Sequence, residues 1–272
     1  MPISIFDILA EQGIENSAAI ALRDCNITRQ YKLDRVGFSD MNALSAVIMA
    51  VPYLIPAECR NISAYAASRD YHLFFKELFA TVIPKLKKAF PSYNFVGFAD
   101  DSPIDERNAA AMAGLGIIGE NGLLITPKHS SYVFLGEIIT DMPLNTVKHE
   151  IVMCEGCGAC KKACPKNSIG ACLSELTQKK GALTESERQS IAEYGIVWGC
   201  DICQEVCPHT KSAVSCGSIY TDIPFFKDSV IPHLSSDLLN NMDDEEFSKR
   251  AYSWRKRATV TRNLYIIEDK KL

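Results

Sequence analysis

The stretch CEGCGACKKACP, residues 154 to 165, carries four cysteines in the spacing C-x2-C-x2-C-x3-C, followed by proline. A second stretch, WGCDICQEVCP at residues 198 to 208, repeats the last three cysteines and the proline with the same spacers. Two-residue spacers let a tight loop present its thiolates to several irons of one cubane cluster, and paired runs of this kind are typical of two-cluster ferredoxins. The two stretches therefore predict a ferredoxin-like domain with two 4Fe–4S clusters.

The spacing also predicts how the cysteines are shared. In two-cluster ferredoxins the last cysteine of one run ligates the cluster of the other run. This exchange gives two ligand sets: Cys154, Cys157, Cys160 with Cys207, and Cys164 with Cys200 and Cys203. The second set lacks one ligand, because Val197 stands where the first cysteine of the second run would be. Cys172 and Cys216 are the nearby candidates, and Cys172 is favoured because it lies one short helix beyond Cys164.

The distribution of the cysteines favours metal binding over disulfides. The chain has eleven cysteines, eight of which fall between Cys154 and Cys207. An odd total suits a disulfide framework poorly, and pairs of C-x2-C can also make tetrahedral zinc sites. Zinc does not explain eight thiolates, two three-residue spacers and two C-P endings. Cys25, Cys59 and Cys216 are interpreted as small apolar residues rather than ligands.

The overall composition is that of an ordinary globular protein. The chain has 272 residues, 47% hydrophobic and 23% charged, and a formal net charge of −4, which gives no global signal for nucleic acid or an anionic membrane. Its longest apolar stretch, residues 46–57, is interrupted by Pro52 and Pro56. The N-terminal residues lack the basic start and apolar core of a signal peptide. These features predict a cytoplasmic protein.

The first 150 residues alternate between strand-like and helix-like segments. Residues 46–54 and 94–99 are expected to be strands, and 68–90 and 103–114 helices, with Pro84 inside the first helix and Ser102 capping the second. Residues 122–126 and 131–140 are expected to form a strand pair. Beyond residue 150 a helix is predicted at 184–195, with a capping box at its start and Gly195 at its end, and two helices over 235–267. The expected domains are 1–150, of α+β or α/β class, and 151–272.

Three motifs in the first half invite a functional interpretation. GLGIIG at 114–119 matches a dinucleotide-binding pattern, but it is expected to end a helix and precede a strand, the reverse of what that site needs. DYHLFF at 70–75 begins like a histidine motif for cobalt, but Phe75 replaces the required glycine, so His72 is interpreted as an ordinary helix residue. ADDSPIDER at 99–107 is either a capping turn or the site of a catalytic Asp100, whose carboxyl group against Phe95, Val96 and Phe98 would have a raised pKa.

Taken together, these residues resemble the epoxyqueuosine reductase family, which is related to the cobalamin-dependent reductive dehalogenases. The resemblance covers nearly the whole chain. It rests on four parts of the sequence: ISAYAASRDYH (62–72), FADDSPIDERNAAAMAGLGIIGENGLLITPKHSSYVFLGEIITD (98–141), both cysteine runs with ACLSELT (171–177), and SWRKRATVTRNL (253–264).

The resemblance implies a nitroreductase-like, cobalamin-binding domain followed by a ferredoxin-like domain with two 4Fe–4S clusters. It assigns Cys172 to the second cluster and makes Asp100 the proton donor, while Tyr65, Leu124 and Leu135 match positions expected to line the corrin. The implied reaction is the reduction of epoxyqueuosine to queuosine in tRNA. The implied partners are tRNA and a low-potential electron donor of flavodoxin or ferredoxin type.

Two departures from the family pattern concern the tRNA. Glu120 replaces a lysine that is common in the family, and the helical-repeat module that follows in full-length relatives is not present in this sequence. Arg255, Lys256, Arg257 and Arg262 are candidates for phosphate contacts, or else charges on a terminal helix. Weak, salt-sensitive tRNA binding is therefore expected. The alternatives to the full assignment are a dicluster electron carrier without cobalamin catalysis and a related reductase with another substrate.

Overall fold

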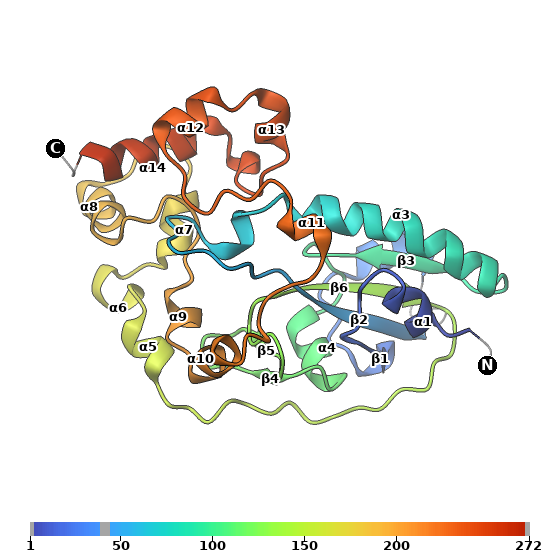
Figure 1. Ribbon diagram of the computed structural model, residues 1–272. Helices are drawn as coiled ribbons and strands as arrows, with labels where there is room; N and C mark the ends of the chain where they lie inside the picture. The colour runs from blue at the N-terminus through green and yellow to red at the C-terminus, as the bar shows by residue number, and fades with distance from the viewer. Residues whose placement is uncertain (1–2, 39–43, 270–272) are drawn as a thin grey trace. The chain divides into compact units, whose positions relative to one another are not determined.

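The computed structural model describes residues 3–38 and 44–269, and the chain forms two compact units (Figure 1). Unit 1 comprises Met1–Pro52 and His72–Gly156, and unit 2 comprises Tyr53–Tyr71 and Cys157–Leu272. The sequence suggests a single division at residue 150. Residues 53–71 group with the cysteine-rich half because their backbone pairs with it: Ser63 N donates to Trp198 O at 2.7 Å, and Val197 N donates to Asn61 O at 2.6 Å.

Unit 1 is a mixed α/β unit built on an antiparallel sheet of four strands in the order β1-β2-β6-β3. The strands are β1 (Ser17–Ala21), β2 (Ser45–Pro52), β3 (Phe95–Phe98) and β6 (Val133–Thr140). A separate short pair consists of β4 (Ile117–Ile118) and β5 (Leu124–Ile125). The α-helices are α1 (Ile5–Ala10), α2 (Gln30–Arg35), α3 (Tyr71–Ala89) and α4 (Glu106–Met112).

The sheet is covered on both faces, with α3 and α4 on opposite sides of it (Figure 1). Along α3 the buried residues recur at helical spacing, as the sequence predicts, and Pro84 lies inside the helix. This helix approaches the sheet closely at Gly136, where a Cβ would collide with the ring of Phe75. Glycine at that point therefore lets the helix backbone approach the central strand.

The opposite face carries the core that surrounds the predicted catalytic segment. Small residues of α4, among them Ala109 and Ala110, pack against Ile48 of β2 and Ile139 of β6. Glu137 projects from β6 on this same face, since it has the same parity as Ile139 along the strand. The sheet and α4 thus enclose an ionisable group within an apolar layer.

Unit 2 is mainly helical. Its α-helices are α5 (Ala159–Ala163), α6 (Lys166–Ile169), α7 (Leu173–Gln178), α8 (Glu185–Tyr194), α9 (Ile202–Glu205), α10 (Pro208–Ser215), α11 (Pro224–Lys227), α12 (Ser236–Asn241), α13 (Asp244–Ser248) and α14 (Arg257–Asp269). Trp198 and Tyr252 are fully buried in its core, with α14 packed against α7 and α8. Asn263 of α14 ties this core together, because its side-chain amide donates to Thr177 O at 2.7 Å and Val197 O at 2.8 Å.

Several local predictions are confirmed, among them helix α8. Thr184 and Glu187 form its capping box, and Gly195 ends it with φ +62°. The stretch 114–119 follows α4 and contains β4, so it does not open a helix, as expected.

Three local predictions are wrong. Ser102 does not cap α4: Asp105 does, accepting from Asn108 N at 3.3 Å, while the Ser102 hydroxyl is used elsewhere. The segments 122–126 and 131–140 do not form one hairpin. The two-residue β5 pairs with β4, whereas β6, apolar on both faces, lies between β2 and β3. Residues 235–267 form three α-helices rather than two, since Ser235 and Asp243 each cap a new one.

Candidate active site and cluster site

Two of the predicted cluster ligands lie on short helices of unit 2 that pack against each other. Cys160 is in α5 and Cys203 is in α9, and these two helices are in contact. All eleven cysteines lie within the described residues, and none is in a disulfide. Since the two helices come from different runs, the packing brings the runs together in the way that ligand exchange between two clusters needs.

Cys172 is close enough to Cys200 for its charge to act on that thiol. Burial raises the pKa of Cys200 to about 12, and the charges of Cys203, Asp201 and Cys172 raise it further. Cys172 is the N-cap residue of α7, whereas Cys216 is exposed at the far end of α10. This arrangement supports Cys172 as the fourth ligand of the second cluster.

Within residues 3–38 and 44–269, no group of three or more Cys, His, Asp or Glu side chains converges on a point that suits one metal ion. A mononuclear zinc site would need such convergence. A cubane does not, because each thiolate binds a different iron and the four sulfurs surround the cluster from outside. Cysteine thiolates are the ligands that iron–sulfur clusters use, and the choice between such clusters and zinc rests on the spacing of the two runs.

A buried carboxylate fixes the segment that presents Cys200 and Cys203. Asp201 accepts hydrogen bonds from the Ser63 hydroxyl and from Ala64 N at 2.6 Å. Burial raises the pKa of Asp201, although both hydrogen bonds favour the ionised form. Nearby, Trp198 Nε1 donates to the Tyr65 hydroxyl at 2.7 Å. Hydrogen bonds with residues 63–65 therefore fix the position of the second cysteine run.

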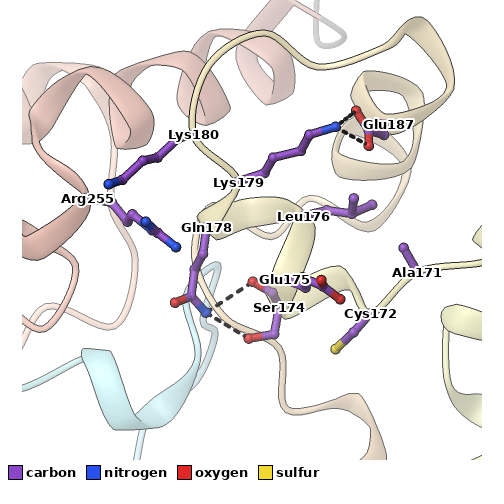
Figure 2. A pocket seen from close by; sticks show the side chains of 10 residues that line it. All are labelled: Ala171, Cys172, Ser174, Glu175, Leu176, Gln178, Lys179, Lys180, Glu187 and Arg255. Atoms are coloured by element: carbon purple, nitrogen blue, oxygen red, sulfur yellow. Dashed lines mark hydrogen bonds and ion pairs between the residues drawn. The ribbon is translucent and has the colours of Figure 1, made fainter.

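An open hollow of about 860 Å³ lies beside Cys172 (Figure 2). In this view Lys180 extends toward Arg255, whose guanidinium points toward Gln178, while Lys179 turns away to pair with Glu187 at 2.7 Å. The hollow therefore combines a predicted cluster ligand with basic side chains.

The predicted proton donor, Asp100, lies in unit 1 just beyond the end of β3. Its φ is +64°, an uncommon left-handed conformation for a residue other than glycine. His72 Nε2 lies 3.4 Å from Asp100 Oδ2, and Asp100 N donates to Glu106 Oε1 at 3.2 Å. The Asp100 side chain is 63% exposed within the chain, so the expected burial against apolar strand residues is wrong.

The other predicted cofactor contacts are divided between the units. Leu124 is buried in the core of unit 1, and Leu135 packs half-buried against the same core. The last residue pair between β3 and β6 is Phe98 with Glu137. Asp100 lies two residues beyond Phe98 and Leu135 two residues beyond Glu137, so both lie at the same end of this strand pair. Tyr65 belongs to unit 2 and bonds to Trp198, as described above.

Three ionisable residues at the site, His72, Glu106 and Glu137, are not predicted from the sequence to have a role. Glu137 is fully buried, its Oε1 accepts the Ser102 hydroxyl, and burial raises its pKa well above the usual range. Burial also raises the pKa of Glu106 to about 7. The sequence signal for Glu137 is a glutamate within the otherwise apolar strand segment FLGEIIT.

The basic residues near the C-terminus are used mainly within unit 2. Arg257 donates to Leu239 O at 2.6 Å and Met242 O at 3.0 Å, which caps the end of α12. Arg262 donates to Lys179 O at 2.9 Å and Gly181 O at 2.6 Å. Of the four candidates for phosphate contacts, Arg257 and Arg262 are therefore committed to structure.

None of the helices over the described ranges, 3–38 and 44–269, combines the length and apolarity needed to cross a membrane.

Comparisons with known proteins agree with both units. Residues 153–210 match the model of the 4Fe-4S double cluster binding domain, so the interpretation of the cysteine runs as a two-cluster domain is confirmed. The chain is 32% identical over 208 residues to the epoxyqueuosine reductase of Listeria monocytogenes, covering 73% of this chain and 54% of that protein. It is 35% identical over 178 residues to that of Pseudomonas aeruginosa, covering 62% and 47%. The chain thus spans about half the length of these curated relatives.

Solved structures show the same fold. The crystal structure of an epoxyqueuosine reductase with an epoxyqueuosine-modified tRNA-Tyr stem loop has a TM-score of 0.75 and 23% identity, covering 97% of this chain and 79% of that one. The resemblance predicted from the sequence is therefore confirmed: through both units the chain is similar, in sequence and in fold, to the epoxyqueuosine reductases.

Proposed function

We propose that this chain is a cytoplasmic iron–sulfur, cobalamin-dependent reductase that converts epoxyqueuosine in tRNA to queuosine. The observation that carries the proposal is the pairing of a two-cluster domain with an aspartate held in a left-handed turn. The relative solved with an epoxyqueuosine-modified stem loop supports the substrate. Removing an epoxide oxygen consumes two electrons and two protons and releases water, so the site must supply both.

The proposed electron path begins at the clusters. One cluster is assigned to Cys154, Cys157, Cys160 and Cys207, and the other to Cys164, Cys172, Cys200 and Cys203. A low-potential donor of flavodoxin or ferredoxin type would deliver electrons singly, and the basic rim of Lys180 and Arg255 beside Cys172 suits an acidic donor.

Unit 1 is proposed to be nitroreductase-like and to hold cobalamin, with Asp100, Leu124 and Leu135 as contacts. Tyr65, the fourth residue expected to line the corrin, belongs to unit 2. Half-buried apolar residues at the edge of the sheet, among them Leu135 and Phe98, suit the apolar face of a corrin next to Asp100. When bound, cobalamin would supply the reducing chemistry at the epoxide carbon. The protein would supply the proton: the Asp100 carboxyl group protonates the departing oxygen, and His72 lies near enough to return a proton to it.

The proposal is tested with Asp100→Asn in the clustered, cobalamin-loaded protein. Asparagine tolerates the left-handed conformation and keeps a similar size, so folding, iron content and cobalamin binding should match those of the parent. Turnover should fall about 100-fold or more, because an amide cannot deliver the proton. Undiminished turnover would show that Asp100 only shapes the turn, and failure to bind cobalamin would favour the electron carrier instead.

A tRNA substrate also makes a prediction about salt. The net charge is −4 and two of the four basic candidates are engaged within unit 2, so few phosphate contacts remain. Stem-loop binding should therefore be weak and should decrease steeply between low and moderate salt. Tight binding that is indifferent to salt would point to a different recognition surface.

A further inference from the structure

Two acids, Glu137 and Glu106, contact the turn that carries Asp100 but take no direct part in the proposed reaction. Glu137 sits in the middle of the central strand β6, opposite Ile48 of β2 and Phe98 of β3, and is completely buried. Its Oε1 accepts the Ser102 hydroxyl. Its Oε2 is equally buried and receives no hydrogen bond from an N–H or O–H group in the part of the chain that the structure describes. A carboxylate in this position would have one oxygen without water or a donor, at considerable cost.

The group that faces this carboxyl is a second acid. Glu106 is in the first turn of α4, which packs on β6, and it lies close enough to Glu137 for each acid to change the pKa of the other. Two ionised carboxylates this close, in a site without water, repel each other strongly, and a proton on one of them relieves that repulsion. Glu137 is the more deeply buried of the two, and a proton on its Oε2 would satisfy that oxygen by donation to Glu106.

The surrounding charges act in the same direction. Asp100 and Asp105 both raise the pKa of Glu106, and Glu106 raises that of Glu137. Because these neighbouring acids all disfavour a further negative charge, Glu106 and Glu137 share one proton instead of both being ionised.

Glu106 in turn holds the backbone of Asp100. Its Oε1 accepts Asp100 N–H at 3.2 Å, at the residue whose φ of +64° needs support from its surroundings. Ser102 completes the link, since its Oγ also accepts Ile104 N–H at 3.0 Å while donating to Glu137. The turn 100–104 is therefore attached to the acid pair at both ends.

We propose that the buried Glu137 and the half-buried Glu106 form an acid pair which shares one proton and holds the Asp100 turn, so that both are positioning residues for Asp100. The shared proton and the hold on the turn follow from unit 1 alone. Their effect on turnover rests on the proposed function.

The first test examines the proton without any substrate. Infrared spectra of the clustered protein at about pH 8, above the pKa of about 7 to which burial raises Glu106, and without cobalamin or tRNA, should contain the carbonyl band of a protonated carboxylic acid in a dry environment. Glu137→Gln should remove that band, because the amide replaces the acid, and the matched change of the exposed Glu15→Gln should leave it. A spectrum that shows no such band, or a band that survives Glu137→Gln, overturns the proposal whatever the enzyme's substrate is.

The second test examines positioning. Glutamine reproduces a protonated Glu137, since its oxygen accepts from Ser102 and its amide donates to Glu106, so Glu137→Gln should keep turnover within about threefold of the parent. Glu106→Ala removes the acceptor of Asp100 N–H and should lower kcat about 10- to 100-fold, with little change in the KM of the stem loop. Ser102→Ala, which deletes one hydroxyl, should give an intermediate loss if Glu106→Ala does not fold. Unchanged kcat in Glu106→Ala and Ser102→Ala refutes positioning. An inactive parent protein that shows the acid band refutes the proposed function but not the shared proton.

Discussion

The Glu137→Gln variant makes a quantitative prediction about how the stability of unit 1 depends on pH. The pKa of Glu137 is raised well above 4.5 by burial, so the folded unit keeps a proton that the opened chain loses. A group whose pKa is raised by folding contributes stability that is present at acid pH and is lost as the pH rises toward the folded pKa. Each proton released on opening lowers the free energy of opening by about 1.4 kcal/mol per pH unit.

Above the ordinary pKa of a glutamate and below the raised folded pKa, the opened chain has an ionised Glu137 while the folded chain does not. Over this window the free energy of opening should fall by about 1.4 kcal/mol per pH unit more in the parent than in Glu137→Gln, about tenfold per pH unit in protection from exchange. Glu106, whose pKa is raised by burial to about 7, contributes to both proteins alike because its partner stays neutral.

The assay is anaerobic amide hydrogen exchange of the peptide that contains β6, corrected for the intrinsic dependence of exchange on pH. It reports the reversible opening of unit 1 without denaturing the clusters. Glu15→Gln, at an exposed site of the same unit, should retain the pH dependence of the parent. If parent and Glu137→Gln show parallel profiles, Glu137 is not a protonated acid and the argument from its unsatisfied oxygen is wrong.

The remaining predictions concern unit 2. Cys172→Ala should lose iron and change the EPR spectrum of the reduced protein. Cys216→Ala, at the exposed end of α10, should keep about eight irons per chain. The reverse result would make Cys216 the ligand. Arg257→Ala should destabilise unit 2 by about 2–4 kcal/mol because the carbonyls of Leu239 and Met242 lose a charged donor, as measured by exchange in α12. Lys256→Ala, which changes an exposed neighbouring side chain, is the control, and equal effects of the two would refute the capping role.

How far the sequence predicts this structure depends on how local each signal is. Three of the signals are local patterns: the spacing of the cysteines, the capping box of α8 and the apolar stripe of α3. The capping box and the apolar stripe lie where the sequence predicts them. The pairing of β6 was mispredicted because an adjacent turn suggested a hairpin with β5, while the real partners, β2 and β3, are far away in the sequence. Strand order depends on packing across the whole sheet, which periodicity does not encode.

The candidate site shows the same limit. Asp100 was identified from its motif, but its expected burial was wrong because φ at Asp100 turns the chain out of the strand. The acids whose pKa burial raises are instead the half-buried Glu106 and the fully buried Glu137, which are 31 positions apart in the sequence and meet only because α4 packs on β6. Ser102 illustrates the point: it has the composition of a cap, yet its hydroxyl serves Glu137.

The central claim is tested most directly by the reaction itself. The anaerobically reconstituted protein, loaded with cobalamin and supplied with a strong reductant, is incubated with an epoxyqueuosine-containing stem loop, and the nucleoside is followed by mass spectrometry. The nucleoside should lose one oxygen atom with the parent protein and none with Asp100→Asn. An intact nucleoside from a protein that holds both clusters and reduced cobalamin would contradict the central claim.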